Sequence, residues 1–141
     1  MTQITSFRSE EVLAVMELLV KWESDENVKE IWLKIDTNGG NIENGMGLVR
    51  LLEVMKTPVV CVADYKAYSF GMVLLQHCPE RVMTKRSVLM VHDTIVMGID
   101  YPVNSHELSE MAQNLEISSR AMMHGLLERL KMTEEEYREK L

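Results

Sequence analysis

The chain has 141 residues, of which 46% are hydrophobic and 26% charged, and its formal net charge is -7. These values are typical of one folded domain with a single core, and they exclude a disordered chain. Lys and Arg are scattered along an acidic chain, which argues against a nucleic-acid partner. No apolar run approaches the roughly 18 residues of a membrane span, and the first residues lack the apolar core of a signal peptide. We therefore expect a single domain, residues 1–141, in the cytoplasm, without a nucleic-acid or membrane partner.

The two cysteines, Cys61 and Cys78, occur outside any CxxC motif or Cys/His spacing. This pattern predicts neither a metal site nor a cofactor held by cysteine. Cytoplasmic cysteines are mostly reduced, so we expect two packed thiols rather than a disulfide.

The first third of the chain predicts a helix, a strand and a second helix. Ser9 is predicted as the N-cap of the first helix, since two glutamates follow it in the first turn. Residues 30–36 alternate apolar and polar side chains, which predicts a strand. The glycine turn TNGGN (residues 37–41) leads into an amphipathic helix, and Pro58 begins the strand PVVCVAD. The apolar helix positions are Val12, Val15, Met16, Leu19 and Val20, then Ile42, Met46, Val49 and Leu52.

The second half predicts a short apolar helix after Ser69, then two strand-like runs, RVMT and SVLMVH. A loop or hairpin is predicted around Gly98 and Pro102. A long helix is predicted from Asn104 to Lys131, because Asn104 and Glu107 have the spacing of a capping box. Its apolar stripe is Leu108, Met111, Leu115, Met122, Leu126 and Leu130. The stripe has two interpretations, core for at least half its length or a subunit interface.

The alternation of strands and helices favours an α/β fold with parallel strand pairs. The glycine turn and the turn AYSFG (residues 67–71) both follow a predicted strand and precede a predicted helix. Ligands bind at that edge of such sheets, and helix N-termini there offer free backbone N–H groups. The sequence therefore places a candidate site at these two turns.

Ser69 is a candidate nucleophile, because it is the serine in a strand–turn–glycine context. A serine hydroxyl needs a neighbouring base and N–H donors for the oxyanion. His92 is the best candidate base, since it ends a predicted strand at the same sheet edge. His77 is expected to face away from the turn, and His106 and His124 are expected on the surface or at an interface. Ala67 replaces the first glycine of GxSxG, which disfavours an α/β-hydrolase.

The residues resemble the proteolytic subunit of the ATP-dependent Clp protease, the ClpP family within the ClpP/crotonase superfamily. TNGG (residues 37–40) matches the family's S-P-G-G turn, and AYSFG matches the A-A-S-M-G setting of its serine. MVH (residues 90–92) matches the family's strand end M-I-H, which includes the histidine. The resemblance runs from about Ser9 to the end of the chain. It implies a β-β-α spiral with a long protruding handle helix, here in the region of about residues 93–131.

The resemblance also implies an activity and its residues. It implies a serine-type endopeptidase that hydrolyses peptide bonds through an acyl-enzyme on Ser69, with His92 as general base. The backbone N–H groups of Gly40 and Phe70 would form the oxyanion hole. The implied partners are a peptide or unfolded protein substrate, further copies of the chain in heptameric rings, and a Clp ATPase; no cofactor or metal is implied.

Several departures from the family pattern lower the expected activity. The family's third catalytic residue is an aspartate beyond the handle, which the alignment places after Leu141, so weak or no proteolysis is expected from residues 1–141. Asp93 and Asp100 are the nearest acids to His92 and are considered as substitutes. No counterpart of the family's axial loops and first strand is expected ahead of Thr5, which argues against normal coupling to the ATPase.

Smaller departures are Asn38 in place of proline, Tyr68 in place of a small residue and Asp93-Thr94 in place of Gln-Pro. Tyr68 either fills the core or narrows the substrate pocket. These changes leave a second hypothesis, a non-catalytic structural or regulatory subunit related to ClpP. A third hypothesis is a crotonase-like protein, which would act on acyl-CoA. The pair Ser69 and His92 argues against it, because crotonases generally lack this pair.

Overall fold

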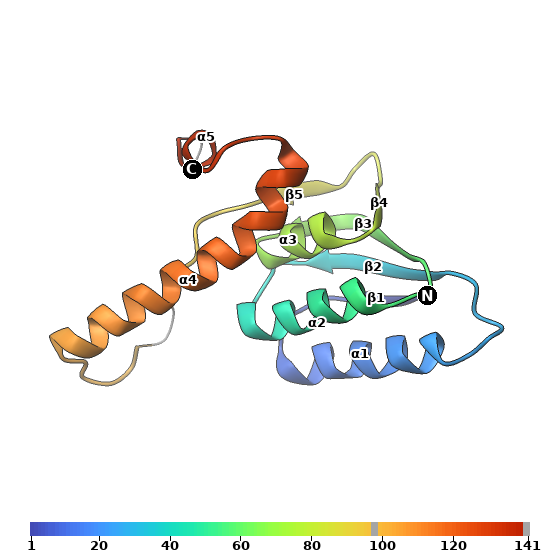
Figure 1. The fold of residues 1–141 in the computed structure, drawn as a ribbon, viewed down its shortest axis with the longest axis horizontal. Helices are drawn as coiled ribbons and strands as arrows, with labels where there is room; N and C mark the ends of the chain where they lie inside the picture. The colour runs from blue at the N-terminus through green and yellow to red at the C-terminus, as the bar shows by residue number, and fades with distance from the viewer. Residues whose placement is uncertain (97–98, 140–141) are drawn as a thin grey trace. The chain divides into compact units, whose positions relative to one another are not determined.

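The computed structural model describes residues 1–96 and 99–139, and the predicted loop centre at Gly98 lies outside them. The chain divides into two compact units, Met1–Val91 and His92–Leu141. The first unit alternates strands and helices (Figure 1). Its elements are β1 (Thr2–Ile4), α1 (Ser9–Glu23), β2 (Ile31–Thr37), α2 (Ile42–Val54), β3 (Val59–Tyr68), α3 (Phe70–His77), β4 (Glu80–Met83) and β5 (Val88–Met90).

Strand β3 is the centre of the sheet. It pairs with β2 along one edge, and with β4 and then β5 along the other, while β1 lies outside β2. All of these pairings are parallel, which confirms the predicted α/β fold with parallel strand pairs. The register shifts between Ile35 and Thr37, so that Thr37 lies opposite Ala67 near the end of β3. This shift brings the end of β2 beside the turn that carries Ser69.

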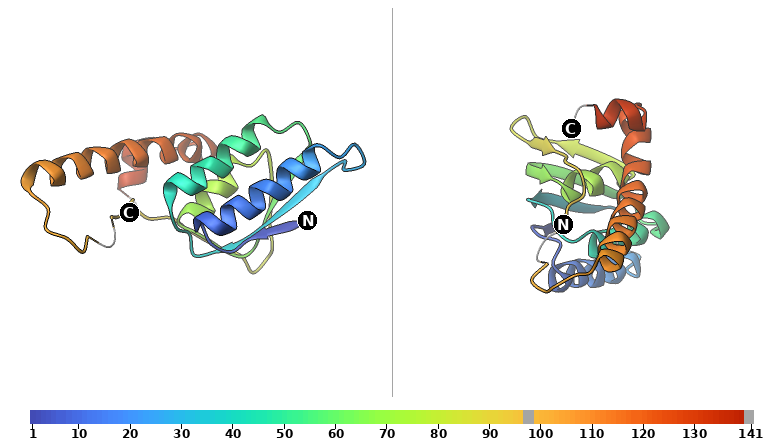
Figure 2. Two further views of the ribbon diagram at one scale, coloured as in Figure 1. Left: turned by 90° about the horizontal axis from the view of Figure 1, so that it is seen from below. Right: turned by 90° about the vertical axis from the view of Figure 1, so that its left-hand side faces the viewer.

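The alternation in β2 separates the two faces of the sheet, as the sequence predicts. Ile31, Leu33 and Ile35 are buried, whereas Trp32 between them is 40% exposed. Helices α1, α2 and α3 lie on one side of the sheet (Figure 2), and α3 packs against β2 and β3. The other face carries polar side chains, including the ion pair Lys34–Asp64 at 2.8 Å.

The start of the first helix differs from its prediction. Arg8 is the N-cap and makes no side-chain cap hydrogen bond, and Ser9 is the first helical residue. The Glu11 carboxylate instead accepts hydrogen bonds from the Thr5 backbone N–H and from the Thr5 and Ser6 hydroxyls. A strand is also present ahead of Thr5, since β1 pairs in parallel with β2. The sequence analysis expects no counterpart of the family's first strand ahead of Thr5, whereas the structure has a short strand there.

In the described part of the second unit there are two helices, each with a capping box, and that of the first is the predicted one. Helix α4 (Ser105–Leu130) begins with the capping box of Asn104 and Glu107, and α5 (Glu134–Arg138) begins with that of Thr133 and Glu136. Residues 92–96 and 99–104 form neither helix nor strand. Within the ranges that the structure describes, no helix is long and apolar enough to span a membrane.

The predicted stripe of α4 is only partly buried. Leu126 is buried, together with Met123 beside the stripe, whereas Leu108 is 56% exposed and Leu130 is 37% exposed. The two ends of the stripe therefore lie outside the core.

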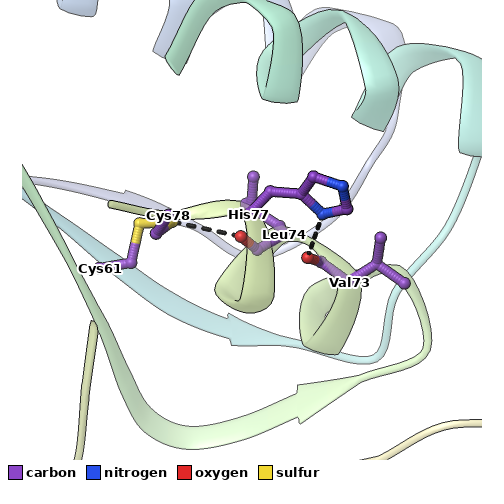
Figure 3. The surroundings of a disulfide bond; sticks show 5 residues. All are labelled: Cys61, Val73, Leu74, His77 and Cys78. Atoms are coloured by element: carbon purple, nitrogen blue, oxygen red, sulfur yellow. Dashed lines mark hydrogen bonds between the residues drawn. A yellow bond between two sulfur atoms is a disulfide. The ribbon is translucent and has the colours of Figure 1, made fainter. Parts of the chain in front are cut away.

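The expectation of reduced cysteines was wrong. Cys61 on β3 and Cys78, the C-cap of α3, form a disulfide (Figure 3). Both residues are fully buried, and the Cys78 Sγ lies 3.2 Å from the Leu74 carbonyl oxygen. Helix α3 follows β3 directly and runs back along it, so its end brings Cys78 beside Cys61 near the start of the strand, 17 residues earlier in the sequence. Sequence spacing alone cannot show that proximity.

Candidate active site

Ser69 occupies the single-residue turn between β3 and α3. Its backbone has φ 52° and ψ -121°, a conformation that residues with a side chain rarely adopt. The Ser69 N–H donates to the Met90 carbonyl at 2.7 Å, and the Ser69 carbonyl accepts from the Met72 N–H at 3.0 Å. These bonds fix the turn between the end of β5 and the first turn of α3. A strained residue held in this way is a feature of functional sites, at a cost of about 1–3 kcal/mol.

The glycine turn after β2 lies directly against the serine turn. Gly39 has φ +96°, and a Cβ added there would lie 2.6 Å from the Ser69 Cβ and 3.1 Å from the Phe70 nitrogen. Gly40 has φ +149°, and a Cβ there would lie 3.0 Å from the Phe7 Cβ. Only glycine meets both the backbone conformation and the close approach at these positions. The structure thus brings the two turns together, as the sequence analysis predicts.

Two backbone N–H groups at this junction have no hydrogen-bond partner within the described part of the chain. They belong to Gly40, which is exposed, and to Phe70, the first residue of α3. The Phe70 N–H lies in the first turn of α3, where unpaired N–H groups attract negative charge. Two free donors therefore lie at the junction that carries Ser69.

Phe7 supports this junction, and the sequence analysis missed it. It is 1% exposed, its ring packs edge-on against the Phe70 ring at 4.9 Å, and Gly40 lies against its backbone. The Asn44 side chain donates to the Phe7 carbonyl at 3.0 Å. Phe7 lies in the connection between β1 and α1, far from both turns in sequence, and no motif marks it.

Thr37 also contributes to the junction and was missed as an individual residue. It is buried at the end of β2, and its Oγ1 accepts a hydrogen bond from the Gly39 N–H at 3.0 Å. Its Cγ2 methyl lies in the space that a Cβ at Gly71 would occupy, at 2.4 Å. Its position in the TNGG turn was a signal, because a threonine two residues before a glycine can bond that glycine's N–H.

His92 belongs to the second unit, so its pairing with Ser69 stays a prediction. It does not end a strand, because β5 stops at Met90. Its side chain is exposed, and its Nδ1 lies 2.5 Å from the backbone carbonyl oxygen of Asp93 rather than from a carboxylate.

Neither candidate acid is shown to orient His92. The Asp93 carboxylate instead influences Tyr137, whose pKa is raised first by burial and then by this negative charge. Asp100 is exposed. Their role as substitute acids therefore stays untested.

Of the other histidines, His77 and His106 have partners on their own helices. The His77 Nδ1 lies 2.9 Å from the Val73 carbonyl oxygen on its own helix (Figure 3). His106 is exposed beside Glu110, and His124 is exposed on α4. The described residues contain no cluster of three or more His, Cys, Asp or Glu side chains that could hold a metal ion.

The fold and the junction of turns define an α/β protein that presents a serine at a strand-to-helix turn, against a glycine turn at the same sheet edge. The family model for the Clp protease matches residues 1–141. The chain belongs to the Clp protease family.

Proposed function

We propose that the chain is a serine endopeptidase of the ClpP type, with Ser69 as nucleophile and His92 as general base. The backbone N–H groups of Gly40 and Phe70 stabilise the oxyanion. Membership of the Clp protease family supports peptide-bond hydrolysis at the level of the family. The role of each individual residue is part of the proposal.

In this mechanism the Ser69 Oγ attacks the peptide carbonyl carbon while its proton passes to a ring nitrogen of His92. The carbonyl oxygen becomes an anion and accepts hydrogen bonds from the two N–H groups. The C–N bond then breaks, and His92 gives the proton to the leaving amine, so that Ser69 holds an ester. Water, deprotonated by His92, hydrolyses that ester and releases the acid.

The observation that carries the proposal is the conformation of Ser69. Its positive φ holds the side chain in a turn rather than in β3 or α3, and its neighbour Phe70 offers an unpaired N–H. A serine with only a packing role has no need of a conformation that costs stability. An acyl-transfer enzyme needs such a conformation, because its nucleophile and its oxyanion donors must face one reacting carbonyl group.

Labelling with a serine-reactive peptidyl phosphonate tests the proposal. We expect adduct on Ser69 in the wild type, none in Ser69→Ala, and at least 10²-fold slower labelling in His92→Ala. Ser109→Ala, an exposed serine on α4, is the matched control and should label as the wild type does. If a family enzyme is labelled under the same conditions and this chain is not, the proposal is wrong.

We further propose that residues 1–141 form one domain whose α4 is the family's handle, and that copies assemble into heptameric rings. The exposed apolar side chains support assembly, because β4, β5 and α4 present several to solvent. They are Val82, Met83, Val88, Met90, Leu108 and Ile117. Native mass measured across protein concentrations tests the assembly; a strict monomer throughout would contradict it.

A non-catalytic subunit is the second candidate, because the described contacts of His92 include a backbone carbonyl but no carboxylate. Without an orienting acid the imidazole is a poorer base. Such a subunit would join an active ClpP ring without being labelled. A Clp ATPase is the further partner that we propose from the family, and pull-down of that ATPase by an assembled ring tests it.

The cytoplasmic location stays a prediction. The buried disulfide weighs against it, because disulfides persist mainly in oxidising compartments.

A further inference from the structure

Thr37 is a buried polar side chain at the junction of the two turns. It is 1% exposed, and a buried hydroxyl costs stability unless it is hydrogen-bonded. Its Oγ1 accepts from the Gly39 N–H at 3.0 Å and donates a longer hydrogen bond to the Gly39 carbonyl at 3.5 Å. One hydroxyl therefore contacts both backbone polar groups of the same glycine.

That glycine is attached to a candidate oxyanion donor. The Gly39 carbonyl and the Gly40 N–H belong to one planar peptide unit and point in opposite directions. Glycines flank this peptide unit on both sides, and both adopt backbone conformations that other residues avoid. Because glycine has the widest backbone freedom, these two residues restrict the rotation of the peptide unit only weakly. A group that fixes the Gly39 carbonyl consequently fixes the direction of the Gly40 N–H.

The other side of the turn has a solvent-exposed restraint. The Lys66 ammonium donates to the Asn38 side-chain carbonyl at 3.0 Å, but this bond is exposed. Water competes for an exposed bond, whereas the hydroxyl of Thr37 belongs to a buried residue and its bonds to Gly39 are partly shielded from solvent. Thr37 also reaches the serine turn, because its Cγ2 packs where Gly71 has no side chain.

We propose that Thr37 is a positioning residue for the oxyanion hole: its hydroxyl holds the Gly39–Gly40 peptide unit so that the Gly40 N–H faces the oxygen bound at Ser69. The inference rests on the proposed function, because it assumes that Gly40 stabilises an anionic oxygen there. Thr37 touches no substrate, and its effect reaches the reaction only through the glycine turn.

Thr37→Val and Thr37→Ser separate the hydroxyl from the methyl group. Thr37→Val keeps the shape and removes the hydroxyl, and Thr37→Ser keeps the hydroxyl. The measurement is phosphonate labelling of Ser69 across probe concentrations, which yields kinact and KI separately. We expect Thr37→Val to lower kinact by about 10- to 100-fold with KI within about twofold, and Thr37→Ser to stay within about threefold of the wild type.

Thr84→Val is the matched control, because the Thr84 hydroxyl donates to the Asp64 carbonyl at 2.8 Å, away from the glycine turn. It should lose stability without a change in kinact. Hydrogen exchange of the Gly39 amide provides a readout that is independent of labelling. That amide should exchange faster in Thr37→Val and remain protected in Thr37→Ser.

The outcomes separate the inference from the function on which it rests. If the wild type is labelled and Thr37→Val is labelled with the same kinact, the inference is overturned and the proposed function stands. The same holds if Thr37→Ser fails to restore kinact, since the methyl group would then be responsible. A wild type that is not labelled under conditions that label a family enzyme overturns both.

Discussion

At the scale of the residue, the backbone of Ser69 connects conformation with function. The sequence context of Ser69, after an apolar strand and before a glycine, predicts a turn. It does not predict φ 52° for a serine, because a side chain at that φ is unfavourable and glycine follows only two positions later. The conformation depends on long-range bonds, above all the bond from the Ser69 N–H to Met90.

Replacement of Ser69 by glycine should stabilise the protein and abolish labelling. Glycine adopts this backbone conformation without strain, and the gain exceeds the entropy that glycine adds to the unfolded chain. We expect Ser69→Gly to raise the free energy of unfolding by about 1 kcal/mol in urea titrations. Ser69→Ala should leave it within about 0.5 kcal/mol, because alanine keeps the strained φ.

Ser109→Gly is the control for the general effect of glycine. Ser109 lies within α4, where glycine is a poorer helix former than serine, so this variant should be less stable than the wild type. If Ser69→Gly loses as much stability as Ser109→Gly, Ser69 is not strained.

At the scale of the element, two glycines in α2 have opposite surroundings. A Cβ at Gly45 would lie 2.2 Å from the Phe70 ring, whereas a Cβ at Gly47 would meet nothing within 4 Å. Both lie in the middle of one helix, so their helix propensity is the same. Gly45 is buried against Phe70, whereas Gly47 is half-buried and faces open space.

Gly45→Ala and Gly47→Ala should change stability in opposite directions. Gly47→Ala should raise the free energy of unfolding by about 0.5–1 kcal/mol, since alanine is the better helix former. Gly45→Ala should lower it by about 1–3 kcal/mol, because the Phe70 ring or the helix must shift. Urea titration measures both. Equal effects of the two variants would show that α2 does not approach Phe70 so closely.

The disulfide joins β3 to the end of α3 and encloses the serine turn. A bridge that closes a loop of about 15 residues stabilises a protein by about 3 kcal/mol, chiefly by restricting the unfolded chain. We expect a reductant to lower the free energy of unfolding of the wild type by about that amount. The double variant Cys61→Ala with Cys78→Ala should be insensitive to the reductant. Two titratable thiols in the denatured, unreduced wild type would contradict the bridge.

At the scale of the whole molecule, local pattern predicted the elements and long-range contact decided the site. The alternation in β2 and the capping box at Asn104 depend on neighbours in sequence, and both predictions are confirmed. The support of Gly40 by Phe7 and the bridge from Cys61 to Cys78 depend on how separate elements pack. No spacing encodes such contacts, so the sequence marked the two turns but neither Phe7 nor the disulfide.

The acid stability of the molecule should depend on two carboxylates of α1. At its start, burial raises the pKa of Glu11, but hydrogen bonds from Ser6 and Thr5 outweigh burial and leave the pKa below the ordinary value of 4.5. At its end, the backbone N–H groups of Lys56 and Thr57 lower the pKa of Glu23. Glu11 thus joins the start of α1 to the connection that precedes the helix, and Glu23 joins the end of α1 to the connection that precedes β3.

A lowered pKa means that the folded state favours the charged carboxylate. The resulting stability is present above about pH 4.5, the ordinary pKa, and is lost as the pH falls through the lower pKa of the folded state. The double variant Glu11→Gln with Glu23→Gln should be less stable at neutral pH, and its stability should fall less steeply below pH 4.5. Glu17→Gln, an exposed position on the same helix, is the control. Thermal unfolding from pH 7 to pH 3 measures the difference, and parallel profiles for the double variant and the wild type would show that these carboxylates do not hold α1.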